Sequence, residues 1–132
     1  APDADIFVVG YPLLVAAPEQ ANCHDAFTKA NLSTGELTMI RTLGTQFNNV
    51  TALETLLGGV YFVPGAKTFL GHEACTSDQS AEWINEVTSS DLSGSFHPNQ
   101  LGYIAYAKAV NALRADLYKY GEIRLDPSCC IE

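Results

Sequence analysis

A histidine followed directly by a proline stands out in the last third of the sequence. His97 closes a long irregular stretch, and Pro98 favours the first turn of a helix because its ring fixes φ near the helical value. An imidazole held by a helix start and facing a loop has the arrangement that a general base needs. The pair therefore allows proton-transfer chemistry. For a His-Pro pair taken alone, however, a histidine that simply caps the helix or packs against it is the more common case.

Other kinds of chemistry find little support in residue types and spacing. His24 and His72 lie close in sequence to Cys23 and Cys75, but their spacing fits no familiar zinc site. No two acidic residues stand at a spacing typical of a paired-carboxylate site. The sequence therefore predicts no metal and no cofactor.

The cysteines indicate an oxidising environment. Four cysteines allow three pairings, and we favour Cys23–Cys75 because each residue lies in a polar loop after a strand-like run. Cys129 and Cys130 are adjacent, and a bridge between them would strain the intervening peptide. We therefore expect one or both to reach another segment or another chain.

Composition and charge narrow the range of partners. The chain has 132 residues, of which 47% are hydrophobic and 17% charged, which is compatible with a packed core. Its net charge of −8 disfavours nucleic acids and anionic membrane surfaces as partners. No apolar run approaches the roughly 20 residues that span a bilayer, so we do not expect an integral membrane protein. N-glycosylation sequons at Asn31 and Asn49 add to the expectation of a secreted protein.

The hydrophobic pattern predicts two short strands and a long helix between them. Residues 6–9 and 60–63 are continuous apolar runs ended by Gly and Pro, which favours strands buried on both faces. Ser33 and Glu36 have capping-box spacing at the start of a helix that Gly58 ends. Apolar spacings of three and four predict one core-facing side for this helix. Its residues are Leu37, Ile40, Leu43, Phe47, Val50, Leu53, Leu56 and Leu57.

The remaining segments complete an α/β pattern. Residues 13–32 predict a loop with one helical turn, and residues 66–96 a long irregular stretch of the kind that is usually functional. A last helix begins at Pro98 and ends at Gly121. The order strand, helix, strand, loop, helix is typical of an α/β fold with a parallel sheet. Two parallel strands cannot cover their own edges, so we expect further strands from elsewhere.

Several blocks, taken in order, resemble secreted SGNH (GDSL-like) hydrolases. The run Phe96-His97-Pro98-Asn99-x-x-Gly102 is similar to the last signature block of that family. Residues 6–12 are similar to a strand that precedes its substrate-binding loops. The resemblance runs from about Asp5 to about Tyr118. Its further blocks are 60–63, Phe69, 71–75 and 83–85.

The resemblance implies a fold and an activity. Residues 1–121 would form the C-terminal half of a flavodoxin-like three-layer α/β/α sandwich with parallel strands, and residues 122–132 a polar, Cys-containing tail. His97 would take the proton from a serine hydroxyl and return it to the leaving alcohol. The implied function is that of a secreted serine carboxylester hydrolase, an esterase or lipase. The alternative is an inactive binding or assembly module derived from such an enzyme.

The group that orients His97 departs from the family pattern. The family usually has an Asp three residues before the histidine, and here that position is Gly94. Some family members orient the histidine with a backbone carbonyl two residues upstream, which here is the carbonyl of Ser95. We favour the Ser95 carbonyl over Asp91, which lies six residues before His97.

The family's nucleophile is missing from the sequence. There is no Gly-Asp-Ser segment and no Gly-x-Asn-Asp segment for an oxyanion hole, and none of the serines stands in a nucleophile turn. The chain alone should therefore be inactive on esters. We expect the N-terminal half of the enzyme on a missing segment or on a second chain, linked through Cys129 or Cys130.

Substrate contacts are expected near the end of the first strand. Tyr11, Pro12, Leu13 and Leu14 follow that strand at its carboxyl end, where α/β sheets bind ligands. With Phe96, they would line an acyl pocket for an ester or lipid. Packing of this run against the long helix is the alternative.

Overall fold

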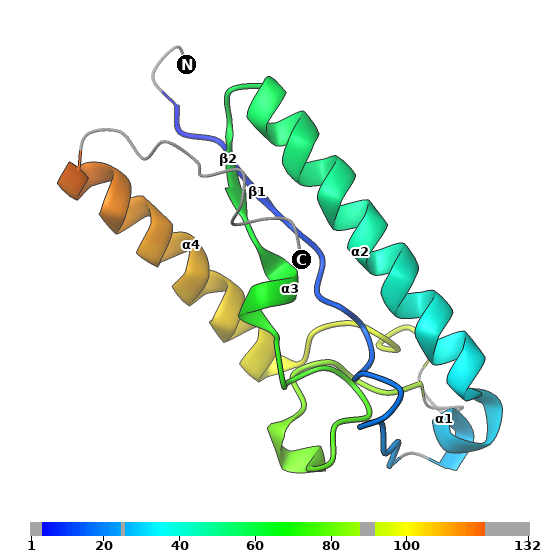
Figure 1. Ribbon diagram of the computed structural model, residues 1–132. Coiled ribbons are helices and arrows are strands. Elements are labelled where there is room, and N and C mark those ends of the chain that lie inside the picture. Colours follow the sequence, from blue (N-terminus) through cyan, green and yellow to red (C-terminus); the bar gives the residue numbers. More distant parts are fainter. Residues whose placement is uncertain (1–3, 25, 88–91, 121–132) are drawn as a thin grey trace.

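Two short strands run between two long helices in the computed structural model, which describes residues 4–24, 26–87 and 92–120 (Figure 1). Asp91, Gly121 and the tail with Cys129 and Cys130 lie outside the described residues. The elements are β1 (Phe7–Val9), α1 (Ala26–Asn31), α2 (Thr34–Leu57), β2 (Tyr61–Val63), α3 (Gly65–Thr68), the 3-10 helix η1 (Gln79–Ala81) and α4 (Gln100–Tyr120).

The strands form a parallel pair. Phe7 lies opposite Tyr61, and Val9 lies opposite Val63, which is only 1% exposed. Figure 1 shows α2 and α4 on opposite sides of this pair. The predicted α/β class with a parallel sheet is confirmed.

Helix α2 begins and ends where the sequence predicts. The hydroxyl of Ser33 accepts a hydrogen bond from the Glu36 N–H, and the Glu36 carboxylate accepts one from the Ser33 N–H at 2.8 Å. These bonds satisfy amide groups that have no partner inside the first turn. At the other end, the Gly58 N–H bonds back to the Glu54 carbonyl, and Gly59 adopts a left-handed φ of 66° that suits glycine.

Helix α2 fully buries one of the residues that were predicted to face the core, Leu37. Its buried residues are Leu37, Asn48 and Thr55, and the Asn48 amide donates to the carbonyl of Tyr11 at 2.7 Å. Gly44 brings the helix against the chain after β1, since an added Cβ would lie 3.3 Å from Leu13. Beyond Leu37, small and polar residues therefore face inward.

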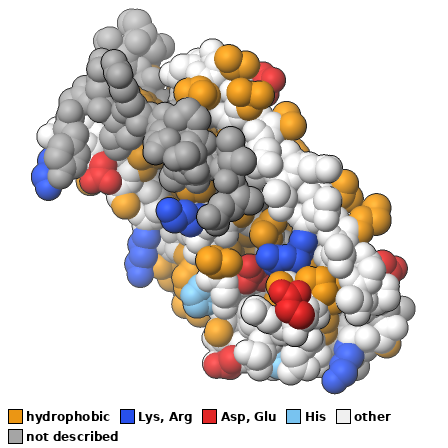
Figure 2. All heavy atoms as spheres, in the orientation of Figure 1, with side chains coloured by type: hydrophobic (Ala, Val, Ile, Leu, Met, Phe, Trp, Pro, Cys, Tyr) orange, Lys and Arg blue, Asp and Glu red, His pale blue; other side chains and the backbone are white. Residues whose placement is uncertain are grey.

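Most of the predicted core-facing side of α2 is exposed instead. Leu43 is 52% exposed and Val50 60% exposed, and Figure 2 shows hydrophobic side chains on the surface along this side of the molecule. We call this surface the α2 stripe. It consists of Met39, Leu43, Phe47, Val50, Leu53 and Leu57.

The long stretch between β2 and α4 has a core of its own. Phe69, Ala74 and Ile84 are completely buried and pack together, with half-buried Trp83, Phe96 and Tyr106 around them. A disulfide joins Cys23 to Cys75, the pairing favoured from the sequence, and so ties the chain after β1 to the chain after β2. Because this core packs against the start of α4, it fixes where that helix begins.

Gly102 allows α4 to approach the Trp83 backbone. A Cβ at position 102 would lie 2.6 Å from the Trp83 carbonyl oxygen and 2.9 Å from the Phe69 ring. Both contacts are shorter than packed atoms tolerate, so only glycine fits this position without a shift of the helix.

We expect Gly102→Ala to lower the free energy of unfolding by about 2 kcal/mol, because it overpacks this contact. Gly35→Ala in α2 is the matched control, since its Cβ would meet only the Ser33 hydroxyl, at 3.9 Å. Alanine there should be neutral or stabilising by up to about 1 kcal/mol. Urea unfolding of both variants measures the difference, and equal stabilities would contradict the close approach.

Candidate active site

His97 lies exposed at the end of the long loop, just before α4. Its Nδ1 lies 2.9 Å from the backbone carbonyl oxygen of Ser95. A carbonyl can only accept a hydrogen bond, so this contact requires the hydrogen on Nδ1. Nε2 is then the nitrogen that can accept a proton.

The loop that carries His97 is paired along its length with the segment 83–85. The Asn85 N–H donates to the His97 carbonyl at 3.0 Å, and the Phe96 N–H donates to the Asn85 carbonyl at 3.1 Å. Ile84 and Pro98 form an antiparallel bridge. These main-chain bonds hold His97 from both sides.

Asn99 fixes the start of α4. Its side-chain oxygen accepts hydrogen bonds from the N–H groups of Leu101 and Gly102, as expected of a helix N-cap. Its side-chain nitrogen donates to the Glu82 carbonyl at 2.7 Å, and its own N–H donates to the Trp83 carbonyl at 2.8 Å. The helix start and the segment before Asn85 therefore form one unit.

The other two histidines are engaged in internal contacts. The ring of His72 stacks on Trp83 with centroids 3.5 Å apart, and its Nδ1 lies 2.7 Å from the Ala81 carbonyl. Nε2 of His24 lies 2.9 Å from the Thr76 carbonyl. Of the three histidines, His97 alone is exposed, whereas His24 and His72 are half-buried.

The residues expected to contact substrate differ in how exposed they are. Tyr11 is 43% exposed and makes an edge contact with Phe47, with ring centroids 6.5 Å apart. Pro12 is fully buried, and the Leu14 carbonyl accepts the Ala74 N–H at 3.1 Å. Phe96 is half-buried against the core of the long loop. The first strand and the histidine loop thus offer Tyr11 as their exposed aromatic residue.

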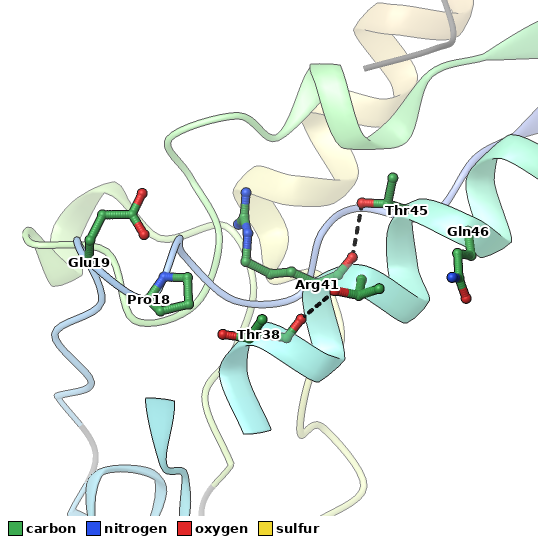
Figure 3. A pocket seen from close by; sticks show the side chains of 7 residues that line it. Pro18, Glu19, Thr38, Arg41, Thr45 and Gln46 are labelled. Atoms are coloured by element: carbon green, nitrogen blue, oxygen red, sulfur yellow. Dashed lines mark hydrogen bonds between the residues drawn. The ribbon is translucent and has the colours of Figure 1, made fainter. Parts of the chain in front are cut away.

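Two hollows lie where the chain leaves β1 and β2, and Arg41 lines both. Figure 3 shows its side chain extending from α2 toward Pro18 and Glu19. Its guanidinium donates to the Val15 carbonyl and lies 3.7 Å from a carboxylate oxygen of buried Glu73. Through these two contacts, Arg41 connects α2 to the chain after β1 and to the loop after β2. His97 lines neither hollow.

Two buried carboxylates lie next to the segment that holds His97. Glu82 and Glu86 are each 7% exposed. The Glu82 carboxylate accepts the Thr76 N–H at 3.1 Å and lies 3.9 Å from Nε2 of His24. The backbone N–H of His24 donates to the Glu86 carboxylate at 2.7 Å. Burial and, to a smaller extent, the neighbouring Glu86 carboxylate raise the pKa of Glu82 to about 7.

The described residues give little support for a metal. The group of possible ligands among them is Cys23, Cys75 and Glu86, and both sulfur atoms belong to the disulfide. Within the same residues, no helix is both long and apolar enough to cross a membrane.

Comparison with known proteins gives two similar solved structures. An extracellular lipase from Streptomyces rimosus is 29% identical, with a TM-score of 0.70. A phospholipase A1 from Streptomyces albidoflavus NA297 is 27% identical, also with a TM-score of 0.70. Each match covers 85% of this chain but only 44% of the other protein, so the chain spans less than half their length. No protein-family model and no curated protein matches the sequence.

The raised pKa of Glu82 predicts a pH-dependent stability. Since the folded chain binds this proton more tightly than the unfolded chain does, the contribution is present below pH 4.5 and is lost as the pH rises toward 7. The free energy of unfolding should fall by about 2 to 3 kcal/mol over that range.

Glu82→Gln should remove most of this decline, because an amide does not titrate. Its oxygen can still accept the Thr76 N–H, so the local contact is kept. Glu54→Gln, at an exposed position of α2, is the control and should keep the decline. Urea unfolding at pH 5 and pH 8 measures both. An unchanged pH dependence in Glu82→Gln would contradict the assignment.

Proposed function

Since the chain has the fold of part of these lipases, in keeping with its likeness to the C-terminal half of SGNH-type hydrolases, we propose that it supplies the catalytic histidine of a secreted serine carboxylester hydrolase. The observation that carries this proposal is the exposed ring of His97, with Nδ1 2.9 Å from the Ser95 carbonyl. The Cys23–Cys75 disulfide is compatible with secretion.

The geometry suits a general base. Nε2 of His97 takes the proton of a serine hydroxyl as the oxygen attacks the ester carbonyl, and the resulting imidazolium later returns that proton to the leaving alcohol. The Ser95 carbonyl accepts the hydrogen of Nδ1 throughout, which fixes the tautomer and stabilises the positive charge. In this proposal, Ser95 rather than Asp91 orients the ring.

The nucleophile and the oxyanion hole belong to the N-terminal half of the enzyme. We place that half against the edge of β1 that no other strand of the described residues pairs with, where added parallel strands would complete a three-layer α/β/α sandwich. Ile6, just before β1, is 55% exposed, and Val9 in β1 is 40% exposed. Tyr11 connects this edge to Phe47 in the α2 stripe, so the two apolar surfaces are continuous. An interface of this kind buries surface that soluble proteins seldom leave open.

The substrate class follows from the neighbours and from one exposed ring. The two similar proteins are described as a lipase and a phospholipase A1, which favours an acyl ester of lipid type. Tyr11 would contact the acyl chain, with Leu13 and Leu14 behind it. Phe96 contributes to this site through its packing beneath the loop.

Joined to a nucleophile-bearing half, the protein should hydrolyse short p-nitrophenyl esters. His97→Ala should lower kcat roughly 10³-fold, because the general base is lost. His72→Asn is the control, since its amide can replace the bond of Nδ1 to Ala81. Retained hydrolysis in His97→Ala would reject the proposal, and a folded, joined enzyme with no esterase activity would favour the binding-module alternative.

A charge placed in the α2 stripe should impair assembly of the two halves. Leu43→Glu and Val50→Glu would each bury a carboxylate in the proposed interface, which is costly without a partner. Thr38→Glu adds the same charge at an exposed position outside the stripe. The yield of the complex on co-expression, measured by size-exclusion chromatography, should fall several-fold for the first two variants only. Equal yields for all three would show that the stripe is not the interface.

A further inference from the structure

A tight turn precedes the ring of His97. The His97 N–H donates to the Gly94 carbonyl at 3.2 Å, which closes a β-turn over residues 94–97. Phe96, the third residue of the turn, has φ 55°, whereas Ser95 is not among the residues with positive φ. A positive φ at the third residue alone is the pattern of a type II turn, where glycine or asparagine is usual. A phenylalanine in this conformation is rare.

The turn type decides which way the Ser95 carbonyl points. Between type I and type II turns, ψ of the second residue and φ of the third differ by roughly 150–170°. That difference turns over the peptide between Ser95 and Phe96. With Phe96 left-handed, the carbonyl of Ser95 lies 2.9 Å from Nδ1 of His97. A relaxed type I turn would carry this oxygen away from the ring.

The contacts of Phe96 hold the strained backbone in place. Its side chain packs against the core formed by Phe69, Ala74 and Ile84. Its N–H donates to the Asn85 carbonyl at 3.1 Å. A change of φ at Phe96 would swing the ring off this core or break the bond to Asn85, so packing compensates the strain.

The side chain of Asn85 closes the turn from the other side. Its Nδ2 donates to the Gly94 carbonyl at 3.2 Å, the same oxygen that accepts the His97 N–H. The backbone of Asn85 also bonds to both Phe96 and His97. Asn85 therefore holds the first, third and fourth residues of the turn.

We propose that Phe96 and Asn85 are positioning residues, which set the tautomer of His97 by keeping the 94–97 turn in its type II conformation, with Phe96 left-handed. The carbonyl of Ser95 then favours the neutral ring with hydrogen on Nδ1, whereas a free imidazole side chain in water prefers hydrogen on Nε2. The geometry stands without the proposed function, and only its importance for ester hydrolysis rests on that function.

Long-range ¹H–¹⁵N NMR of the chain at a pH where His97 is neutral reads the tautomer directly. His97→Asn identifies the signals of this ring among the three histidines. The unsubstituted chain should show mainly the Nδ1–H form. A majority of Nε2–H would overturn the proposal.

Variants of Phe96 separate backbone conformation from packing. Phe96→Ala and Phe96→Gly remove the same ring, but glycine enters the left-handed region freely and alanine does not. The ratio of Nδ1–H to Nε2–H should fall several-fold in Phe96→Ala and should fall less in Phe96→Gly. A residue that served only to pack would give the same ratio in both.

Asn85→Ala gives an independent reading, because this side chain is exposed and its loss should leave the chain folded. The share of Nδ1–H should fall here too. Leu37→Ala destabilises the fold at a buried position of α2, outside the loop and the core that Phe96 packs against, and should leave the tautomer unchanged. If Asn85→Ala keeps the tautomer of the unsubstituted chain, the proposed role of Asn85 is wrong. If the tautomers behave as expected but the joined enzyme is inactive, the proposed function fails alone.

Discussion

Main-chain pairing between residues 83–85 and the loop 96–99 is the constraint on which the candidate site depends. It binds the His97 backbone on one face and the N-cap Asn99 on the other, so that the ring and the helix start cannot move separately. The buried core of Phe69, Ala74 and Ile84 supports this pairing from below. Gly102 lets α4 lie close enough to share it. The exposed imidazole is thus carried on a loop whose backbone is held in place, and the proposed proton transfer at a fixed distance requires such support.

The sequence predicted the local features of the fold better than its faces. The capping box at Ser33 and the glycine that ends α2 depend on neighbouring residues, and both were found as expected. The inward side of α2 depends on residues far apart in sequence. Gly44 and Asn48 allow close contact with the chain after β1, and that contact, rather than the number of leucines, decides the orientation. Periodicity reports that a helix has an apolar side but not what covers it.

The same distinction applies to the site. His97 and the Ser95 carbonyl were singled out from a short run of sequence through its resemblance to a known family. The role of Asn85 was not predicted beyond its place in a family-like block. Two of its three hydrogen bonds to the loop come from its backbone, and backbone bonds do not depend on residue type. The burial of Glu82 and Glu86 was also not predicted from the sequence. Carboxylates normally lie at the surface, and only tertiary packing encloses these two. A left-handed Phe96 could not be foreseen, because the turn rules favour glycine there.

The α2 stripe has a colloidal consequence for the chain on its own. None of its six side chains carries a charge, so two molecules that meet along α2 lack a local barrier to contact. What separates them is the overall charge of −8, and that repulsion reaches only about 10 Å at 0.1 M salt. Added salt would therefore shorten the repulsion and leave the attraction intact. We therefore expect the chain alone to be most soluble at low ionic strength and to aggregate as the salt concentration rises.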